Sequence, residues 1–241
     1  KGWRNVLGLC VLPLILVLLI FAYCAKEAPD RPVPKAVREY AAVLRDGDAW
    51  SFMFFYGITF GGFVGLASSL TLYFHDQYGM PAVTAGSWTA VCVLAGSFMR
   101  PVGGFVADRV GGIYVLSVLY IVTATTLGML SLGMPDVWMA IAALIVSLAA
   151  LGMGNGAIFQ LLPQRFRSEF GMMTGLVGMA GGLGGFILAS GLGYSKQLTN
   201  SYQTGFLGFA LLALVALLGL TRIKGRWRTT WGTAVLGSVR I

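Results

Sequence analysis

The sequence predicts an all-α membrane protein with seven transmembrane helices. Of its 241 residues, 57% are hydrophobic and only 11% are charged, whereas soluble domains carry about 25% charged residues. Several apolar runs exceed the roughly 18 residues that a spanning helix needs. Proline, glycine and charged residues interrupt these runs, as loops between helices require. The predicted spans are about 5–25, 50–74, 82–107, 113–132, 137–163, 172–190 and 202–220.

The basic residues of the loops predict the orientation of these spans. Thirteen of the 17 Lys and Arg residues lie in segments 26–49, 108–112, 164–170 and 221–241, whereas the opposite side carries only Lys1, Arg4 and Lys196. Cytoplasmic loops carry the excess of positive charge in membrane proteins. We therefore expect a multi-pass protein of the cell (inner) membrane whose 26–49 segment and C-terminus are cytoplasmic. The net charge of +8 then reflects topology and contact with the lipid bilayer, and no nucleic-acid partner is expected.

The chain divides into four predicted segments. Residues 1–25 hold one span, and residues 26–49 form a polar connection that is rich in proline and then in charge. Residues 50–223 hold six spans, and residues 224–241 form a basic, tryptophan-containing tail that suits the membrane interface. An odd number of spans with an external first end predicts that an upstream part is missing. We expect 26–49 to be a cytoplasmic inter-domain linker.

No enzymatic or metal chemistry is predicted. The three cysteines are widely spaced in apolar stretches, so free thiols are expected. The only histidine, His75, lies in a predicted external loop, far from any nucleophile or metal-ligand cluster. We therefore expect a protein that is not an enzyme and that has no cofactor and no metal.

Arg100 is the one basic residue that no loop accommodates. It lies eight residues before Asp108, and this places it about 12 Å inside a hydrocarbon core about 30 Å thick. All nine acidic residues fall in predicted loops, so no carboxylate is available at that depth. One interpretation is that Arg100 caps carbonyls or extends toward the inner surface. The other is that it faces a water-filled cavity and binds a mobile anion, because its planar fork of donors suits planar oxyanions.

The segment GGFVADRVGG, residues 103–112, resembles the G-x-x-x-D-R-x-G-G loop motif of the major facilitator superfamily. The matching positions are Gly104, Asp108, Arg109 and Gly112. This resemblance implies that the seven spans correspond to helices six to twelve of that fold. The first span would then be the last helix of a missing N-terminal half.

Four runs together resemble the C-terminal half of the nitrate/nitrite porters. They are FFYGITFGGFVG, GSFMRPVGGFVADRVGG, GMGNGAIFQLLPQRF and GLVGMAGGLGGF. The resemblance implies that Arg100 binds the anion together with a second arginine of the missing half. It also implies that an aromatic ring packs on the anion and that a glycine-rich helix lines the path. The positions implied for the substrate site are Arg100, Tyr56, Phe60, Asn155, Gly178, Gly181 and Gly182.

The residues themselves leave alternatives open at these positions. Tyr56 and Phe60 share one helix face; ordinary helix packing would also explain Phe60, and a generic interhelical hydrogen bond would also explain Tyr56. The glycine run of residues 171–185 forms one stripe, which fits either a tight helix–helix seam or a surface that slides against a neighbour.

We expect transport of nitrate or nitrite, or both, by alternating access, through nitrate/nitrite antiport or nitrate/proton symport. The alternatives are a carrier for another small anion and a transport-dead half that acts as a membrane sensor.

Overall fold

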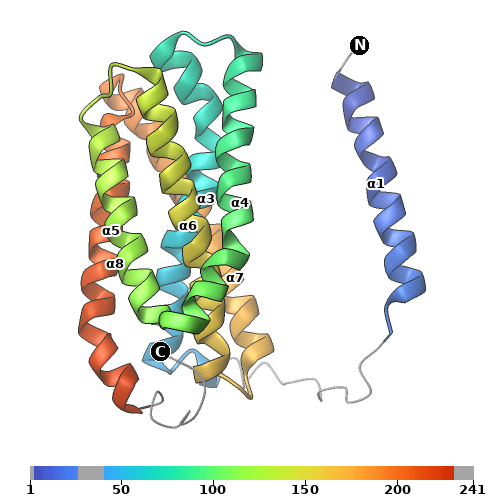
Figure 1. Cartoon of the computed structure of the whole chain (residues 1–241), viewed down its shortest axis with the longest axis vertical. Helices are drawn as coiled ribbons and strands as arrows, with labels where there is room; N and C mark the ends of the chain where they lie inside the picture. The colour runs from blue at the N-terminus through green and yellow to red at the C-terminus, as the bar shows by residue number, and fades with distance from the viewer. Residues whose placement is uncertain (1–2, 27–40, 231–241) are drawn as a thin grey trace. The chain divides into compact units, whose positions relative to one another are not determined.

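The computed structural model describes residues 3–26 and 41–230, and within these residues all long elements are helices (Figure 1). The predicted all-α class is confirmed, because seven described helices are long and apolar enough to cross a membrane. The chain forms two units, residues 1–39 and residues 40–241. The first unit contains α1 (Trp3–Cys24). The second contains α3 (Gly47–Tyr78), α4 (Ala82–Val110), α5 (Gly112–Ser131), α6 (Val137–Arg165), α7 (Phe170–Thr199) and α8 (Gln203–Thr230).

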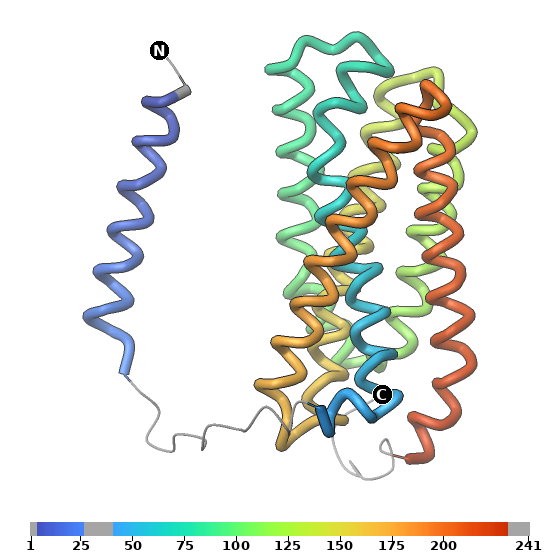
Figure 2. The backbone as a smooth tube through the Cα atoms, turned by 180° about the vertical axis from the view of Figure 1, so that it is seen from behind, coloured from blue at the N-terminus to red at the C-terminus, as the bar shows by residue number. Residues whose placement is uncertain are grey.

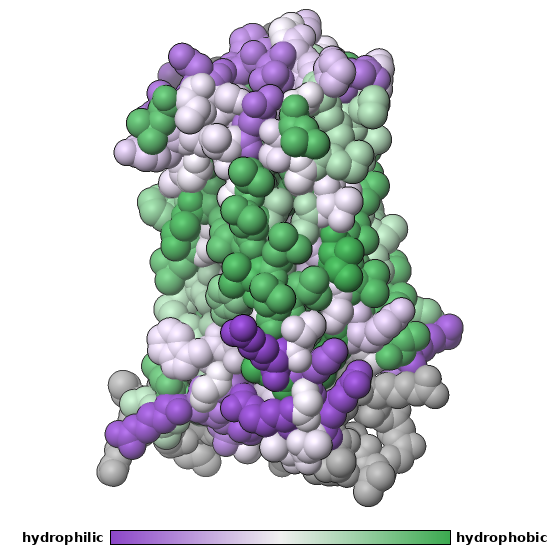
Figure 3. Space-filling view, turned by 90° about the vertical axis from the view of Figure 1, so that its left-hand side faces the viewer, coloured by the Kyte–Doolittle hydropathy of each residue, from purple (hydrophilic) through white to green (hydrophobic). Residues whose placement is uncertain are grey.

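The second unit is a six-helix bundle. α3 packs mainly on α7, and α4 packs mainly on α6, while α5 lies against both α6 and α8. α7 runs obliquely across the face seen in Figure 2. Hydrophobic residues form a band across the middle of the face in Figure 3, with hydrophilic residues at both ends. This pattern fits helices whose outer surfaces meet lipid.

Several helices extend beyond their predicted spans. α3 begins at Gly47, where the Asp46 side chain accepts a hydrogen bond of 2.8 Å from the Asp48 N–H, and α8 continues to Thr230. Asp48, Asp76 and Asp108 therefore lie in terminal turns of helices rather than in loops. Hydropathy locates only the apolar part of a helix, so it predicts loops where the helices continue as polar turns outside the hydrocarbon core. The proline-rich part of the 26–49 segment and the last eleven residues lie outside the described residues.

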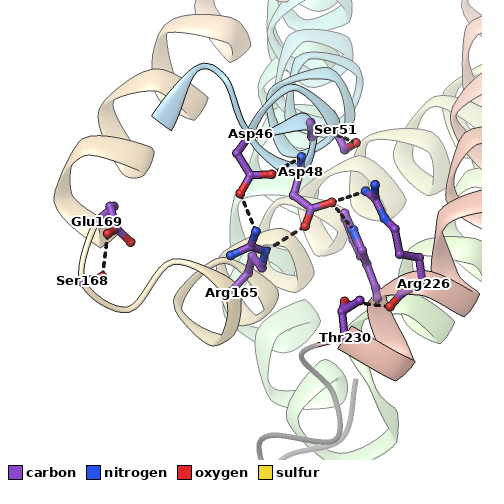
Figure 4. Close-up of polar contacts among 10 residues, drawn as sticks. Asp46, Asp48, Ser51, Arg165, Ser168, Glu169, Arg226 and Thr230 are labelled. Carbon is purple, nitrogen blue, oxygen red and sulfur yellow. Dashed lines mark hydrogen bonds and ion pairs between the residues drawn. The ribbon is translucent and has the colours of Figure 1, made fainter. Parts of the chain in front are cut away.

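A buried carboxylate joins three helices at one end of the bundle, which we name the linker end (Figure 4). Asp48 is only 6% exposed. Its Oδ1 accepts a hydrogen bond of 2.7 Å from Trp227 Nε1, and its Oδ2 accepts one of 2.8 Å from Arg165 Nε. Arg226 pairs with the same Asp48 carboxylate, and Arg165 also pairs with Asp46. The N-terminus of α3 is thereby fixed to the C-terminal parts of α6 and α8.

The opposite end of the bundle is closed by aromatic residues. The Tyr202 hydroxyl donates a hydrogen bond of 2.8 Å to Asp76 Oδ2, and Tyr78 donates one of 2.9 Å to the Met134 carbonyl. Burial and the hydrogen bond to Asp76 raise the pKa of Tyr202 to about 12. These contacts join the end of α3 to the α5–α6 and α7–α8 connections.

Glycines bring two helix pairs into backbone contact. A Cβ atom on Gly184 of α7 would lie 2.3 Å from the Gly57 carbonyl oxygen of α3. A Cβ atom on Gly156 of α6 would lie 2.1 Å from the Arg100 carbonyl oxygen of α4. Small residues allow such close approach between helices in lipid. The two glycine-rich helices α6 and α7 therefore pack mainly on different partners, α4 and α3, rather than on each other.

Candidate functional site

Arg100 lies in the interior of α4, next to Pro101. Proline has no N–H to donate, so the carbonyl one turn earlier lacks its usual helical partner and the helix can bend here. The Arg100 Cζ atom lies 4.7 Å from the ring centroid of Phe63 and 5.3 Å from that of Phe60. Its Nε atom is buried and has no hydrogen-bond partner among the described residues. Its neighbours thus contribute π faces rather than a carboxylate.

Three aromatic rings form a row of contacts that starts beside this guanidinium. Phe60 and Tyr56, both from α3, are stacked with their ring centroids 5.2 Å apart and their planes 5° apart. Phe159 of α6 meets Tyr56 edge-on at 5.3 Å. The structure therefore brings Arg100, Phe60 and Tyr56 into one group, and it adds Phe63 and Phe159. The spacing of Phe63, one turn after Phe60, is the signal that could have indicated the fourth aromatic residue.

The glycines of α7 divide into two sets. Gly181 packs beneath the aromatic pair, because a Cβ atom there would lie 2.7 Å from Tyr56 Cε1 and 2.8 Å from Phe60 Cδ1. By contrast, a Cβ atom on Gly178 or Gly182 would meet no atom within 4 Å. Of the three predicted α7 glycines, only Gly181 therefore contacts the Arg100 group. Gly178 and Gly182 lie on an open face of the same helix.

Asn155 is a buried polar residue next to the α4–α6 contact. It is 3% exposed, and neither its Nδ2 nor its Oδ1 atom has a hydrogen-bond partner among the described residues. Its neighbour Gly156 touches the Arg100 backbone. Buried amides are normally hydrogen-bonded, so an amide without a partner often marks a place for water or a ligand.

The residues of the loop motif shape the turn between α4 and α5. Gly111 has a φ of 101°, which favours glycine, and a Cβ atom on Gly112 would lie 2.6 Å from Gln160 Oε1. The Arg109 guanidinium carbon lies 4.0 Å from the Phe105 ring centroid. Asp108, Arg109 and Gly112 lie at or near this turn, at the linker end, whereas Gly104 lies about one helical turn after Arg100 and beside Gly156.

A cavity of about 730 Å³, which we name the linker-end cavity, lies beside α4, α6 and α7. Its lining residues are Gly104, Asp108, Gly156, Phe159, Gln160, Pro163, Gln164, Arg167 and Phe170. Sequence reasoning missed Phe159 and Gln160, although both follow Asn155 within about one and a half helical turns. Among the described residues, no cluster of His, Cys, Asp and Glu could hold a metal ion.

The group around Arg100 has the chemistry of an anion site. A guanidinium offers planar, directional donors, and the rings exclude water on one side. Arg100 is half-buried, and a partly desolvated charge without a counterion is unfavourable, so an anion that pairs with Arg100 would gain affinity from relieving that cost.

Comparison with known proteins identifies the fold family. The sequence profile of the Major Facilitator Superfamily matches residues 1–189. The chain belongs to the major facilitator superfamily. In structure it is similar to the proton:xylose symporter XylE, with a TM-score of 0.54, 16% identity and coverage of 78% of this chain and 49% of that one.

The sequence relatives of this superfamily member include named nitrate carriers. The chain is 30% identical to the "Probable nitrate transporter NarT" of Staphylococcus epidermidis over 92% of its own length and 57% of the relative. It is 29% identical to the "Probable nitrate/nitrite antiporter NarK1" of Thermus thermophilus, over 90% of its own length and 53% of the relative. The chain thus spans about half the length of these curated relatives.

Proposed function

We propose that the protein transports nitrate, nitrite or both across the cell (inner) membrane, with Arg100 as the anion-binding residue. The observation that carries this proposal is the Arg100 guanidinium, which lies against Phe60 and Phe63, has a buried Nε atom without a hydrogen-bond partner, and forms no ion pair among the described residues. The names of the sequence relatives support the choice of anion. Membership of a superfamily of carriers supports transport rather than enzymatic catalysis.

In this proposal the described bundle is the C-terminal half of a carrier. A missing N-terminal half would supply a second arginine, and α1 would be the last helix of that half. The anion would bridge the two guanidinium groups, and the loss of their mutual repulsion would let the two halves close around it. The anion can drive this closure only if it binds the closed state more tightly than the open states.

The surrounding residues would orient the anion. Phe60, backed by Tyr56 and Gly181, would hold one ring against it, and the unpaired amide of Asn155 would supply a donor. The open faces of Gly178 and Gly182 would line the path, where small residues keep the helix surface smooth.

The basic segments support an orientation in which the linker end is cytoplasmic. No acidic residue or histidine of the described bundle lies near mid-depth, since Asp48, Asp76 and Asp108 lie in terminal turns. Nitrate/nitrite exchange needs no proton relay, whereas proton symport would need groups or water supplied from elsewhere.

The decisive experiment compares wild type with Arg100→Lys in the full-length carrier, rebuilt with its upstream coding region. The assay is nitrate uptake into nitrite-loaded proteoliposomes. Lysine keeps the positive charge but lacks the planar N–H donors of the guanidinium. The loss of one charged hydrogen bond of about 1.5–3 kcal/mol implies that exchange falls by roughly 10- to 100-fold. Arg222→Lys is the matched control, because Arg222 lies on the exposed surface of α8.

Equal exchange in wild type and Arg100→Lys would show that Arg100 is structural. If the folded wild-type carrier exchanges no nitrate, the same assay with other small anions tests the first alternative. A carrier that moves no anion would favour the sensor interpretation.

A further inference from the structure

The linker-end cavity begins next to the Arg100 group. Gly156 lines the cavity, and its Cα lies against the Arg100 carbonyl. Phe159 also lines the cavity and contacts Tyr56 edge-on at 5.3 Å. At its other end the cavity is lined by Arg167 and Phe170, which are exposed residues. The cavity therefore extends from residues that contact the Arg100 group to exposed residues of the linker end.

The cavity wall carries hydrogen-bonding groups that have no partner. Both side-chain amide atoms of Gln160 are buried and without a hydrogen-bond partner among the described residues. Gln164 uses its Nε2 atom to donate a 3.1 Å hydrogen bond to the Gln160 carbonyl, and its buried Oε1 atom has no partner. Native structures rarely leave buried amides unpaired. A rotation of these side chains toward the cavity would bring the buried atoms into reach of a ligand or ordered water there.

The charges of the wall favour an anion that is held weakly. Arg167 supplies a cationic group, whereas Asp108 supplies a carboxylate that opposes a bound anion. The volume of about 730 Å³ would hold roughly 20 water molecules at 30 Å³ each. A small oxyanion could thus remain partly hydrated here. Conduction through a pathway requires sites that bind an ion weakly enough to release it.

We propose that Gln160 and Arg167 form a second, weaker station for a small planar oxyanion, between the Arg100 site and the linker-end opening. This inference rests on the proposed function. Turned toward the cavity, the Gln160 amide would donate a directional hydrogen bond, and Arg167 would supply the attracting charge. The station would exchange the anion between Arg100 and bulk water in two smaller steps.

A purely structural role for Gln160 makes a different prediction. Its Oε1 atom lies close to Gly112, at the turn between α4 and α5, and it could simply fill space there. In that case leucine and glutamate at position 160 would have similar effects. An anion station responds to the sign of the charge, so glutamate must weaken it more than leucine does.

The test uses the 241-residue chain in lipid nanodiscs, with a reporter thiol at the cavity opening. Phe170→Cys supplies the thiol, in a background with Cys10→Ser and Cys24→Ser because both native thiols are exposed. Cys92 is buried and is retained. The measurement is the rate at which the anionic reagent 2-sulfonatoethyl methanethiosulfonate labels position 170, over a series of sodium nitrate concentrations at constant ionic strength. Circular dichroism in nitrate-free buffer checks the folding of each variant.

We expect nitrate to slow the labelling of position 170. Gln160→Glu and Arg167→Gln should each raise the half-protecting nitrate concentration by at least roughly fivefold, the effect of one charge contact in a hydrated site. Gln160→Leu should raise it less than Gln160→Glu. Arg222→Gln, which removes a basic residue outside the cavity lining, should leave protection unchanged, and so should Arg100→Lys.

Three outcomes would overturn the second station. They are protection that survives both Gln160→Glu and Arg167→Gln, equal effects of leucine and glutamate at position 160, and protection that disappears in Arg100→Lys. The transport assay separates this inference from the proposed function. Arg100-dependent exchange without nitrate protection at position 170 would refute the station alone. If nitrate protects position 170 but exchange is the same in wild type and Arg100→Lys, the proposed role of Arg100 is refuted and the station is supported.

Discussion

The glycines of α7 allow a paired test of packing within one helix. In Gly184→Ala the new methyl group would lie 2.3 Å from the Gly57 carbonyl oxygen, whereas in Gly182→Ala it would meet nothing within 4 Å. The first contact is more than 1 Å shorter than an ordinary van der Waals contact of about 3.5 Å. The opposing atom belongs to backbone, so relief requires α7 to move away from α3.

The difference between the two variants isolates the packing energy. Both exchanges gain roughly 0.5–1 kcal/mol of helix propensity, because glycine loses more backbone entropy than alanine. Overpacking of a tight contact costs typically 1–3 kcal/mol. We therefore expect Gly184→Ala to be less stable than Gly182→Ala by about 1–3 kcal/mol.

Reversible unfolding of the detergent-solubilised chain in sodium dodecyl sulfate, followed by circular dichroism, measures this difference. Equal stability of the two variants, or a more stable Gly184→Ala, would refute the seam between α3 and α7. Exchange measured on Gly182→Ala in the rebuilt carrier then tests the separate proposal that Gly182 lines the path.

Two further predictions concern the ends of the bundle. Asp48→Ala should lower the free energy of unfolding by about 2–4 kcal/mol, because it removes the buried carboxylate that accepts hydrogen bonds from Arg165 and from the Trp227 indole N–H. Asp46→Ala, at a more exposed helix cap, should cost only about 1 kcal/mol, and a smaller loss in Asp48→Ala than in Asp46→Ala would contradict the cluster. Because the pKa of Tyr202 is raised to about 12, its contribution is fully present below pH 10 and is lost as the pH rises from about 10 to about 12. Tyr202→Phe should remove on the order of 2 kcal/mol of this alkaline dependence in unfolding measured against pH, and identical pH profiles for both proteins would contradict it.

The fold class was predictable because hydropathy acts over whole helices. Each span needs only an apolar run of sufficient length, and a few substitutions do not change that property. Helix ends were predicted less well, because α3 and α8 continue into polar turns outside the hydrocarbon core, where the sequence need not be apolar. The position of Arg100 in the interior of its helix and the common face of Tyr56 and Phe60 followed from helix geometry alone.

The sequence by itself determined that an arginine lies deep in an apolar helix, with no carboxylate at the same depth. It also determined that α7 carries a stripe of glycines. Only the tertiary structure decided which rings meet the guanidinium, and it selected Phe63 and Phe159 beside the expected Phe60 and Tyr56. It also decided that Gly181 and Gly184 are packed while Gly178 and Gly182 are open. The physical reason is that periodicity defines the face of one helix, whereas the contacts of that face depend on how neighbouring helices cross it.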